Sequence, residues 1–313
     1  MLQPHALVIG ASNYDLKGRT HANHIPKTSN PGTIRDSAGG VARNIAENLA
    51  RLGDRATLLS AVGNDTFGHK ILETTGAAGV DISRIKITNE CNTGTFLAIL
   101  NHYGDLVSAI ADLDAISLIT VDYLEKNKEV FDTASFVILD ADIPPESIEY
   151  SIAKCAERDI PICIEPVSVT RAKQIVPYLS SLAMITPNRE EAEALVNFSL
   201  NSGEAVKEAG RVLVNKGIKW VIITLGPEGV LYATADDNEF LPSISTVVTD
   251  TVGAGDALTS GTINGLMSGL SLGDAVRRGI ACANLTLQTR LSVSPDITLE
   301  KVKAMASSIF ISR

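Results

Sequence analysis

Thr251-Val252-Gly253-Ala254-Gly255-Asp256-Ala257 is the stretch that decides how this chain is interpreted. A run with strand character, Ser245-Thr246-Val247-Val248, precedes it, and an apolar helical pattern over 257–270 follows. Two glycines at a strand-to-helix junction let backbone amides converge on one concavity, which suits a phosphate at the positive end of a helix. Asp256 adds a carboxylate, and a carboxylate beside a phosphate is unfavourable unless it removes a proton. The stretch therefore favours a small-molecule kinase, with a tight turn and an N-capping Asp as the alternative.

Two more motifs lie upstream of this stretch. Thr224-Leu225-Gly226-Pro227-Glu228-Gly229 follows the apolar run 220–223, and a G-x-x-G turn after a buried strand lets the backbone approach a nucleotide phosphate. Asn188 and Glu191 have N-x-x-E spacing at an expected helix start, where they share one face and can hold a hydrated Mg²⁺. Each also has a structural explanation, Asn188 as a helix cap and Glu191 as an acid favoured by the helix dipole.

Together and in this order, the motifs resemble the ribokinase-like family of sugar kinases, also called the phosphofructokinase-B family. The amino-terminal part is similar as well: Gly39-Gly40-Val41-Ala42-Arg43-Asn44 opens a periodic helix, and Gly63-Asn64-Asp65-Thr66-Phe67-Gly68 carries the family's G-x-D-x-x-G. The resemblance covers nearly the whole chain. Within the family, Asp15-Leu16-Lys17-Gly18, Asn30-Pro31-Gly32 and Gly-Gly-Val-x-Arg-Asn look most like pseudouridine kinases.

The resemblance implies ATP-dependent phosphorylation of the 5′ hydroxyl of pseudouridine or of another ribose-containing substrate. In this interpretation Asp256 removes the hydroxyl proton, and the amides of Gly253, Ala254 and Gly255 stabilise the transferring phosphoryl group. The expected ATP-binding residues are Asn188, Thr224, Gly226, Gly229 and Asn284, with Glu191 holding Mg²⁺ through water. Family members bind a monovalent cation just before the glycine stretch, so Asp250 and Val252 are candidate K⁺ ligands.

The same resemblance assigns an acceptor site near the end of the first strand. Asp15 lies just beyond that strand, where ligands bind in open α/β sheets, and would accept hydrogen bonds from two ribose hydroxyls. Gly39 and Gly40 would let the sugar lie against the backbone, and Asn44 would bond a ribose oxygen. Further candidates, each with a solvated or structural alternative, are Arg43, Lys17, Asn13, Thr93 and Asp112.

The order of apolar runs indicates one α/β domain over residues 1–313. Strand candidates at 7–9, 136–139, 162–165, 184–185, 220–224 and 230–232 alternate with helical patterns. This alternation predicts a mainly parallel sheet covered by helices on both faces, that is, a three-layer α/β/α sandwich. Two insertions, at about 13–37 and 91–112, interrupt the pattern, and the second is typical of a β-hairpin. In the resembled family such insertions form a small β-sheet lid that is shared across a homodimer.

Composition restricts the classes of partner. Hydrophobic residues make up 45% of the 313 and charged residues 20%, which is ordinary for a globular protein. The formal net charge of −9 argues against a nucleic-acid surface, which needs a basic field. Four cysteines without C-x-x-C spacing indicate reduced thiols, and no apolar run approaches a membrane span in length. We therefore expect a cytoplasmic protein that binds a small molecule and neither nucleic acid nor a membrane.

Two functions of other classes are weighed against the kinase. A Rossmann-type oxidoreductase would need G-x-G-x-x-G after the first strand, and Ile9-Gly10-Ala11-Ser12-Asn13 lacks it. A non-catalytic sugar- or nucleotide-binding protein could keep the fold, and loss of Asp256 would have favoured that reading. Asp256 is present.

Overall fold

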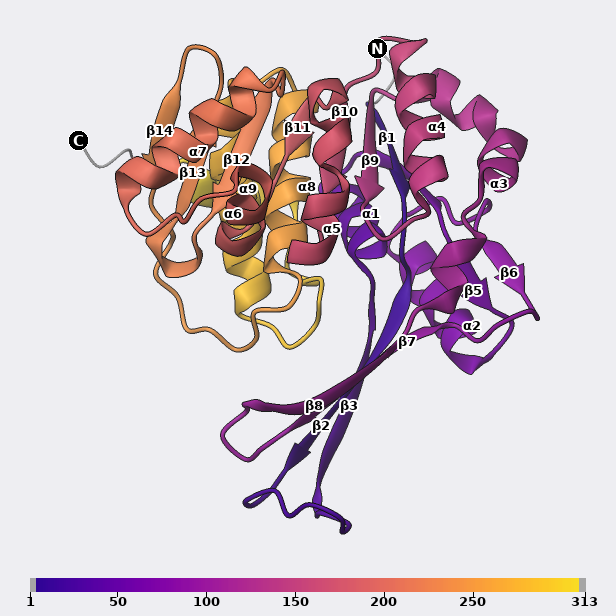
Figure 1. Cartoon of the computed structure of the whole chain (residues 1–313). Helices are drawn as coiled ribbons and strands as arrows, with labels where there is room; N and C mark the ends of the chain where they lie inside the picture. Colours follow the sequence, from indigo (N-terminus) through magenta and orange to yellow (C-terminus); the bar gives the residue numbers. More distant parts are fainter. Residues whose placement is uncertain (1–3, 310–313) are drawn as a thin grey trace.

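The central feature of the computed structural model, which describes residues 4–309, is an eight-stranded sheet (Figure 1). Its order is β14-β13-β12-β11-β10-β9-β1-β4. In this order the six strands from β4 to β12 pair in parallel, and β13 and β14 continue the sheet beyond β12 as two antiparallel strands at one edge. The bounds are β1 (His5–Ile9), β4 (Arg55–Leu59), β9 (Phe136–Asp140), β10 (Ile162–Glu165), β11 (Met184–Ile185), β12 (Trp220–Thr224), β13 (Val230–Ala233) and β14 (Asn238–Leu241).

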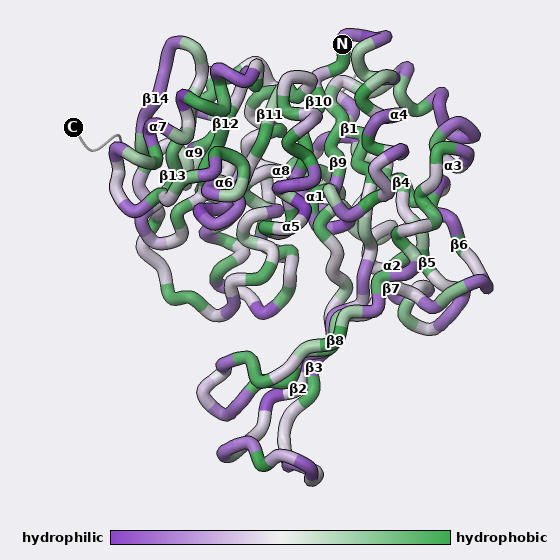
Figure 2. The backbone as a smooth tube through the Cα atoms, viewed as in Figure 1, coloured by the Kyte–Doolittle hydropathy of each residue, from purple (hydrophilic) through white to green (hydrophobic). Residues whose placement is uncertain are grey.

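Helices cover both faces of this sheet, because its central strands are largely apolar and bury side chains on both sides (Figure 2). In β1, Leu7 and Ile9 pack into one core with α3 to α7, whereas Ala6 and Val8 pack into another with α1, α2, α8 and α9. The helices are α1 (Val41–Arg51), α2 (Thr66–Ala77), α3 (Val121–Lys126), α4 (Pro145–Ala156), α5 (Val169–Gln174), α6 (Arg189–Val196), α7 (Gly203–Asn215), α8 (Ala254–Met267), α9 (Leu272–Leu287) and α10 (Leu299–Ala306). The predicted three-layer α/β architecture is confirmed. None of the helices in residues 4–309 is long and apolar enough to cross a membrane.

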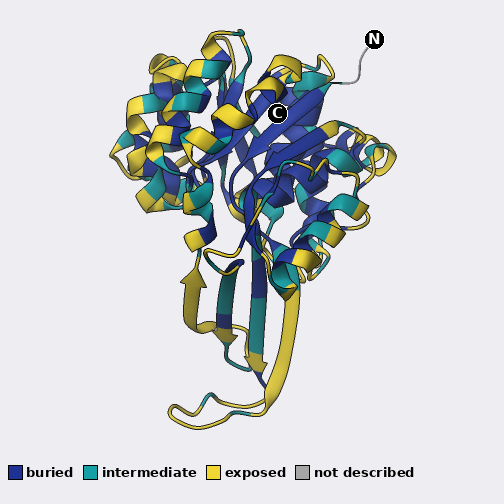
Figure 3. Ribbon diagram, turned by 90° about the vertical axis from the view of Figure 1, so that its right-hand side faces the viewer, coloured by how far each residue is buried: buried dark blue, intermediate teal, exposed yellow. Residues whose placement is uncertain are grey.

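A second sheet projects from this body (Figure 1). Its order is β3-β2-β7-β8, and its strands are β2 (Asn13–Thr20), β3 (Gly32–Gly39), β7 (Gly94–Leu100) and β8 (Leu106–Asp112). We call these four strands the projecting sheet. Figure 3 shows that much of it is exposed, in contrast to the buried central strands. A two-stranded sheet, β5 (Ala61–Gly63) with β6 (Lys86–Thr88), lies between the two insertions in sequence.

Asp65 ties the projecting sheet to the body. Its carboxylate caps α2 by accepting from the amide of Gly68 at 2.8 Å. The same carboxylate accepts from the amide and the hydroxyl of Thr93, each at 2.8 Å, directly before β7. The G-x-D-x-x-G motif therefore fixes where β7 enters the projecting sheet.

One strand expectation is wrong. Residues 245–248, with their β-branched side chains, form no strand, because the central sheet ends at β14 and offers this run no partner. Val247 is 84% exposed. The run instead lies along the approach to α8, where Val248 borders the cavities described below.

Candidate active site

The site is built around Asp256, in the first turn of α8. Gly253 caps this helix with φ 82°, a left-handed conformation that favours glycine. Asn44, near the start of α1, donates from Nδ2 to Oδ2 of Asp256 at 2.8 Å. Both side chains are buried, so two helices that pack together bring an amide from the amino-terminal part of the chain onto the predicted base.

Burial raises the pKa of Asp256 to about 7. The hydrogen bond from Asn44 and the charge of Arg43 act in the opposite direction, whereas the negative charge of Asp15 raises the pKa further. A carboxylate that titrates near neutral pH is suited to accept a proton from a hydroxyl group.

Asp15 lies on β2, with its carboxylate buried against the turn that leads to α1. A Cβ on Gly39 would lie 2.5 Å from Oδ2 of Asp15, and one on Gly40 would lie 2.5 Å from the carbonyl oxygen of Ala11. These two positions therefore need glycine for the backbone to pass this close. Burial raises the pKa of Asp15, against the charges of Lys17 and Arg43.

The glycine stretch forms the floor beside Asp256. A Cβ on Gly253 would overlap the carbonyl oxygen of Ser292, whereas one on Gly255 would meet no heavy atom within 4 Å apart from its own helix and neighbours. Gly255 thus presents open space. The amide of Ala254 donates a hydrogen bond to the carbonyl oxygen of Thr251 at 3.3 Å. Since the first amides of an α-helix have no partner within the helix, the start of α8 offers donors to an anion.

A cavity of about 660 Å³ opens at this helix start. Four predicted ATP-binding residues line it: Thr224, Gly226, Gly229 and Asn284. Of the other lining residues, Ala254 and Gly255 belong to the predicted glycine stretch. The sequence analysis missed those from an irregular segment and from two helices, which carry no motif. Those residues include Ser243, Ile244, Ser245, Thr246, Val248, Leu258, Ile280, Ala283 and Leu287.

Asn188 and Glu191 do not line that cavity. Oδ1 of Asn188 accepts from the amide of Glu191 and Oε2 of Glu191 accepts from the amide of Asn188, both at 2.9 Å, which makes a capping box. Burial raises the pKa of Glu191. Their structural role is therefore realised, and a hydrated Mg²⁺ would use the oxygen lone pairs that the caps leave. Within residues 4–309 no group of three His, Cys, Asp or Glu could hold a metal ion.

A second cavity, of about 1050 Å³, lies between the projecting sheet and the loop before α8. Lys17 lines it, together with Asp250 and Val252 from the loop. The two cavities share Val248 and Thr251, immediately before the glycine stretch. A donor in one cavity and an acceptor in the other would thus meet beside the start of α8.

The remaining acceptor candidates differ in placement. Asn13 shares a sheet face with Asp15 because side chains alternate along β2. Asp112 lies on the opposite face, since Thr95 pairs with both Tyr14 and Asp112. Two others are engaged by the protein. The hydroxyl of Thr93 contacts Gly63 and Asp65, and the guanidinium of Arg43 donates to Ala38, Asn44, Glu47 and Thr75.

Comparison with known proteins identifies the family. The model of the pfkB family of carbohydrate kinases matches residues 3–298. The chain belongs to this family. It is 30% identical to the pseudouridine kinase of Escherichia coli (strain K12), over 97% of each chain. A carbohydrate kinase from Agrobacterium tumefaciens has 27% identity and a TM-score of 0.86, covering 98% of both chains. Arabidopsis thaliana ribokinase, solved with ribose and ATP, has 22% identity and a TM-score of 0.83, covering 98% and 99%.

This pfkB kinase is a phosphotransferase that acts on a sugar hydroxyl. The predicted resemblance to ribokinase-like sugar and nucleoside kinases is confirmed, and the oxidoreductase and non-catalytic alternatives fall away.

Proposed function

We propose that this kinase transfers the γ-phosphoryl group of ATP to the 5′ hydroxyl of pseudouridine. The observation that carries the proposal is the position of Asp256. It is held by Asn44 at 2.8 Å in the first turn of α8, and the same turn contributes Ala254 and Gly255 to the wall of the first cavity. A proton acceptor beside a cavity of nucleotide size is the arrangement that phosphoryl transfer to a hydroxyl needs.

The first cavity fits ATP. Its walls are largely apolar, which suits a base, and Gly226 and Gly229 have positive φ angles of 58° and 101°, so the backbone there can pass close to phosphates. When bound, ATP supplies the phosphoryl group and Mg²⁺ neutralises part of its charge. The chain's own residues do the remaining work. Asp256 takes the proton of the attacking hydroxyl, and the amides at the start of α8, with Gly255 in open space, hold developing negative charge.

Pseudouridine is supported by the relative named above and by one chemical feature. Its C–C glycosidic bond frees a ring N–H that uridine lacks, so a selective site needs an acceptor for it. Of the candidates Asn13, Asn30, Thr93 and Asp112, Asn30 binds its own loop, Thr93 is engaged and Asp112 faces away. Asn13 remains, on the Asp15 face of β2. We assign it as the acceptor.

The projecting sheet is proposed to close over the nucleoside and to pair with that of a second copy. The face opposite Asp15 carries Ile34, Ile99 and Ile110, which are 78%, 37% and 65% exposed. An apolar sheet face of this kind needs a cover, and the same face of a second copy matches it in chemistry. Ile34→Asp combined with Ile110→Asp should convert a dimer to a monomer in sedimentation. A wild-type protein that sediments as a monomer would overturn the pairing.

The function is tested by measuring ADP release with pseudouridine, uridine, adenosine and ribose. Leaving a buried acceptor unpaired costs about 1–3 kcal/mol, so kcat/KM for pseudouridine should exceed that for uridine by about tenfold or more. Asn13→Ala should remove this preference while keeping turnover. Equal rates on the two nucleosides, or a preference for ribose, would overturn the pseudouridine assignment and leave a kinase for another ribose-containing substrate. If none of the four compounds led to ADP release, both the pseudouridine assignment and the assignment to another ribose-containing substrate would be overturned.

A further inference from the structure

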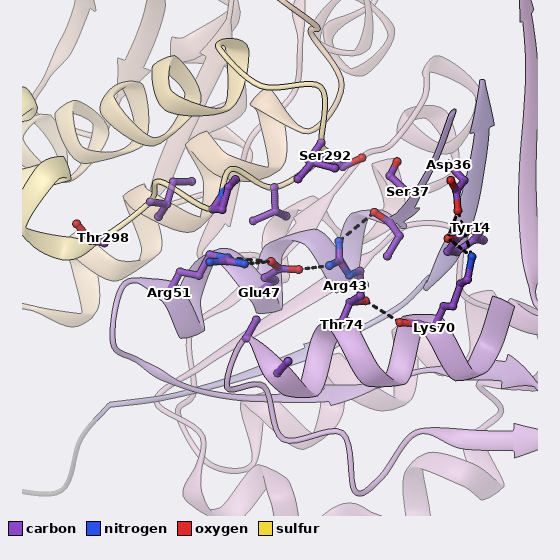
Figure 4. A pocket seen from close by; sticks show the side chains of 17 residues that line it. Tyr14, Asp36, Ser37, Arg43, Glu47, Arg51, Lys70, Thr74, Ser292 and Thr298 are labelled. Carbon is purple, nitrogen blue, oxygen red and sulfur yellow. Dashed lines mark hydrogen bonds and ion pairs between the residues drawn. The ribbon is translucent and has the colours of Figure 1, made fainter. Parts of the chain in front are cut away.

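A chain of polar contacts runs from the surface of α1 to Asp256. Figure 4 shows its outer part, from Arg51 through Glu47 to Arg43. Nε of Arg51 donates to Oε1 of Glu47 at 2.8 Å, and Glu47 forms an ion pair with Arg43. Nη1 of Arg43 donates to Oδ1 of Asn44 at 3.0 Å, and Nδ2 of Asn44 donates to Asp256. Arg51, Glu47 and Arg43 all line an open cavity of about 840 Å³, although Arg43 and Glu47 are each only 4% exposed.

Burying such a chain of charged side chains between helices is energetically unfavourable. Removing a guanidinium and a carboxylate from water carries a large desolvation penalty, and apolar side chains of similar volume would pack as well. The fork of Arg43 is further fixed by the carbonyl of Ala38 at 3.1 Å and the hydroxyl of Thr75 at 3.2 Å. Burial lowers the pKa of Arg43 to about 10, so it stays cationic at neutral pH. A buried cation held this firmly calls for a role beyond packing.

That role follows from the chemistry of an amide. The side chain of Asn44 has one end that donates and one that accepts, and only the donor end favours a carboxylate. Because Arg43 donates to Oδ1, Nδ2 must point at Asp256. If Arg43 were absent, the amide could turn and set its oxygen against the base.

We propose that Arg43 is a positioning residue for the catalytic base: it fixes the amide of Asn44 so that Nδ2 donates to Asp256, and Glu47 in turn holds Arg43. The proposal rests on the proposed role of Asp256 as the base. It assigns Arg43 a function other than contact with the substrate.

The charges around Asp256 give this chain a second, measurable consequence. The charge of Asp15 on β2 favours the protonated form of Asp256. Asp256 in turn raises the pKa of Asp140 at the end of β9 and of Glu165 at the end of β10. Arg43 is the cation that acts on Asp256 among the described residues. Loss of its charge should therefore move the acidic limb of the kcat profile to higher pH.

The test is the pH profile of kcat for Arg43→Gln and Glu47→Gln, with melting temperature and ATP affinity measured on the same samples. Arg43→Gln should lower kcat about ten- to a hundredfold and shift the acidic limb upward by roughly half a pH unit or more. Glu47→Gln removes a negative charge and leaves Arg43, so its limb should not move upward even though kcat falls. Both should bind ATP as the wild type does.

Arg278→Gln is the matched control. Arg278 is also buried and also donates to an asparagine, Asn264, at 2.8 Å. Neither residue belongs to the chain of contacts that leads to Asp256. It should lose stability without moving the limb. The positioning role is overturned if the limb of Arg43→Gln stays in place, or if Arg278→Gln shifts it equally. Should Arg43→Gln fail to fold, an upward shift in Glu47→Gln would overturn the role by itself. Failure of the base assignment would show separately, as retained turnover in Asp256→Asn.

Discussion

The ammonium group of Lys17 lies 2.8 Å from Oδ2 of Asp250 and so joins the projecting sheet to the loop that leads into α8. The other carboxylate oxygen accepts from the amide of Val252 at 3.1 Å. Burial would raise the pKa of Asp250, but the bond from Lys17 and the backbone amides outweigh it and the pKa is lowered. Both residues of the ion pair line the cavity of about 1050 Å³. A monovalent cation at Asp250 would therefore meet a carboxylate that already has a positive neighbour.

Lys17→Met should weaken the acceptor and spare the nucleotide. Lys17 lines the cavity of about 1050 Å³ in which we place the acceptor, and loss of one charge-assisted hydrogen bond corresponds to a rise in the KM for the acceptor on the order of tenfold. The melting temperature should change little, because a partly exposed ion pair contributes at most about 1 kcal/mol. Lys70→Met is the control, since Lys70 pairs with Asp36 at the other side of the sheet. Equal rises in both KM values would place Lys17 outside the acceptor site.

The dependence of turnover on K⁺ should differ between the wild type and Lys17→Met. Because Lys17 already neutralises Asp250, we expect turnover of the wild type to respond weakly to K⁺ and that of Lys17→Met to respond more strongly. A wild type that needs K⁺, with Lys17→Met no more dependent on it, would show that the ammonium does not compete for this carboxylate.

Asp15→Ala should weaken nucleoside binding by about 2–4 kcal/mol, the loss expected for two hydrogen bonds to a carboxylate. ATP affinity should be nearly unchanged, because Asp15 is on β2 and does not line the cavity of about 660 Å³ in which we place ATP. Asp112→Ala removes an exposed acid from the opposite face of the same sheet and should leave both affinities intact. Calorimetry that finds equal losses for the two ligands of Asp15→Ala would contradict the assignment.

The two glycines of the 253–255 turn should respond to alanine in opposite ways. Gly253→Ala drives a Cβ into the backbone of Ser292 at a positive φ, so the variant should be strongly destabilised. Gly255→Ala places a methyl group in open space within a helix, so its stability should be equal or higher by about 0.5–1 kcal/mol. Its turnover should fall roughly a hundredfold, because the methyl group displaces the phosphoryl group. A fully active Gly255→Ala would mean that no phosphate lies there.

The strands of the central sheet and the turn before α8 could be predicted because each is specified by a short stretch of sequence. The apolar runs that became β9, β10 and β12 are continuous, since both faces of a parallel strand are covered by helices. The glycine turn before α8 can likewise be predicted from the sequence, because its backbone conformation favours glycine. Both features depend on neighbours along the chain.

What could not be predicted depends on contacts between distant segments. Asn44 and Asp256 are 212 residues apart, and no pattern in either segment specifies that they meet. The face that Asp112 occupies depends on a register that shifts at Ile99/Leu100. Arg43 was a candidate for substrate contact because its position in the motif is known but its partners are not. Those partners come from β3, α1 and α2.

The protonation state of Asp256 should limit turnover in acid. With its pKa near 7, the base is protonated in acid, so kcat should fall about tenfold per pH unit below that value. Asp256→Asn keeps the shape and cannot accept a proton. Its turnover should be lower by about 10²–10⁴-fold at pH 8, with ATP affinity nearly unchanged. A variant that keeps more than about a tenth of the wild-type turnover would exclude Asp256 as the base.

The same substitution should stabilise the fold, in a way that depends on pH. In the unfolded chain an Asp ionises near 3.9, so between that pH and 7 the folded state binds more protons than the unfolded state, and wild-type stability falls as pH rises. Above pH 7 the buried charge would cost at most about 4 kcal/mol. Asn carries no such charge. Melting temperatures without ligand should therefore coincide near pH 4 and diverge up to pH 8, with Asp256→Asn the higher. Parallel curves would show that Asp256 is ionised without penalty and that its pKa is not raised.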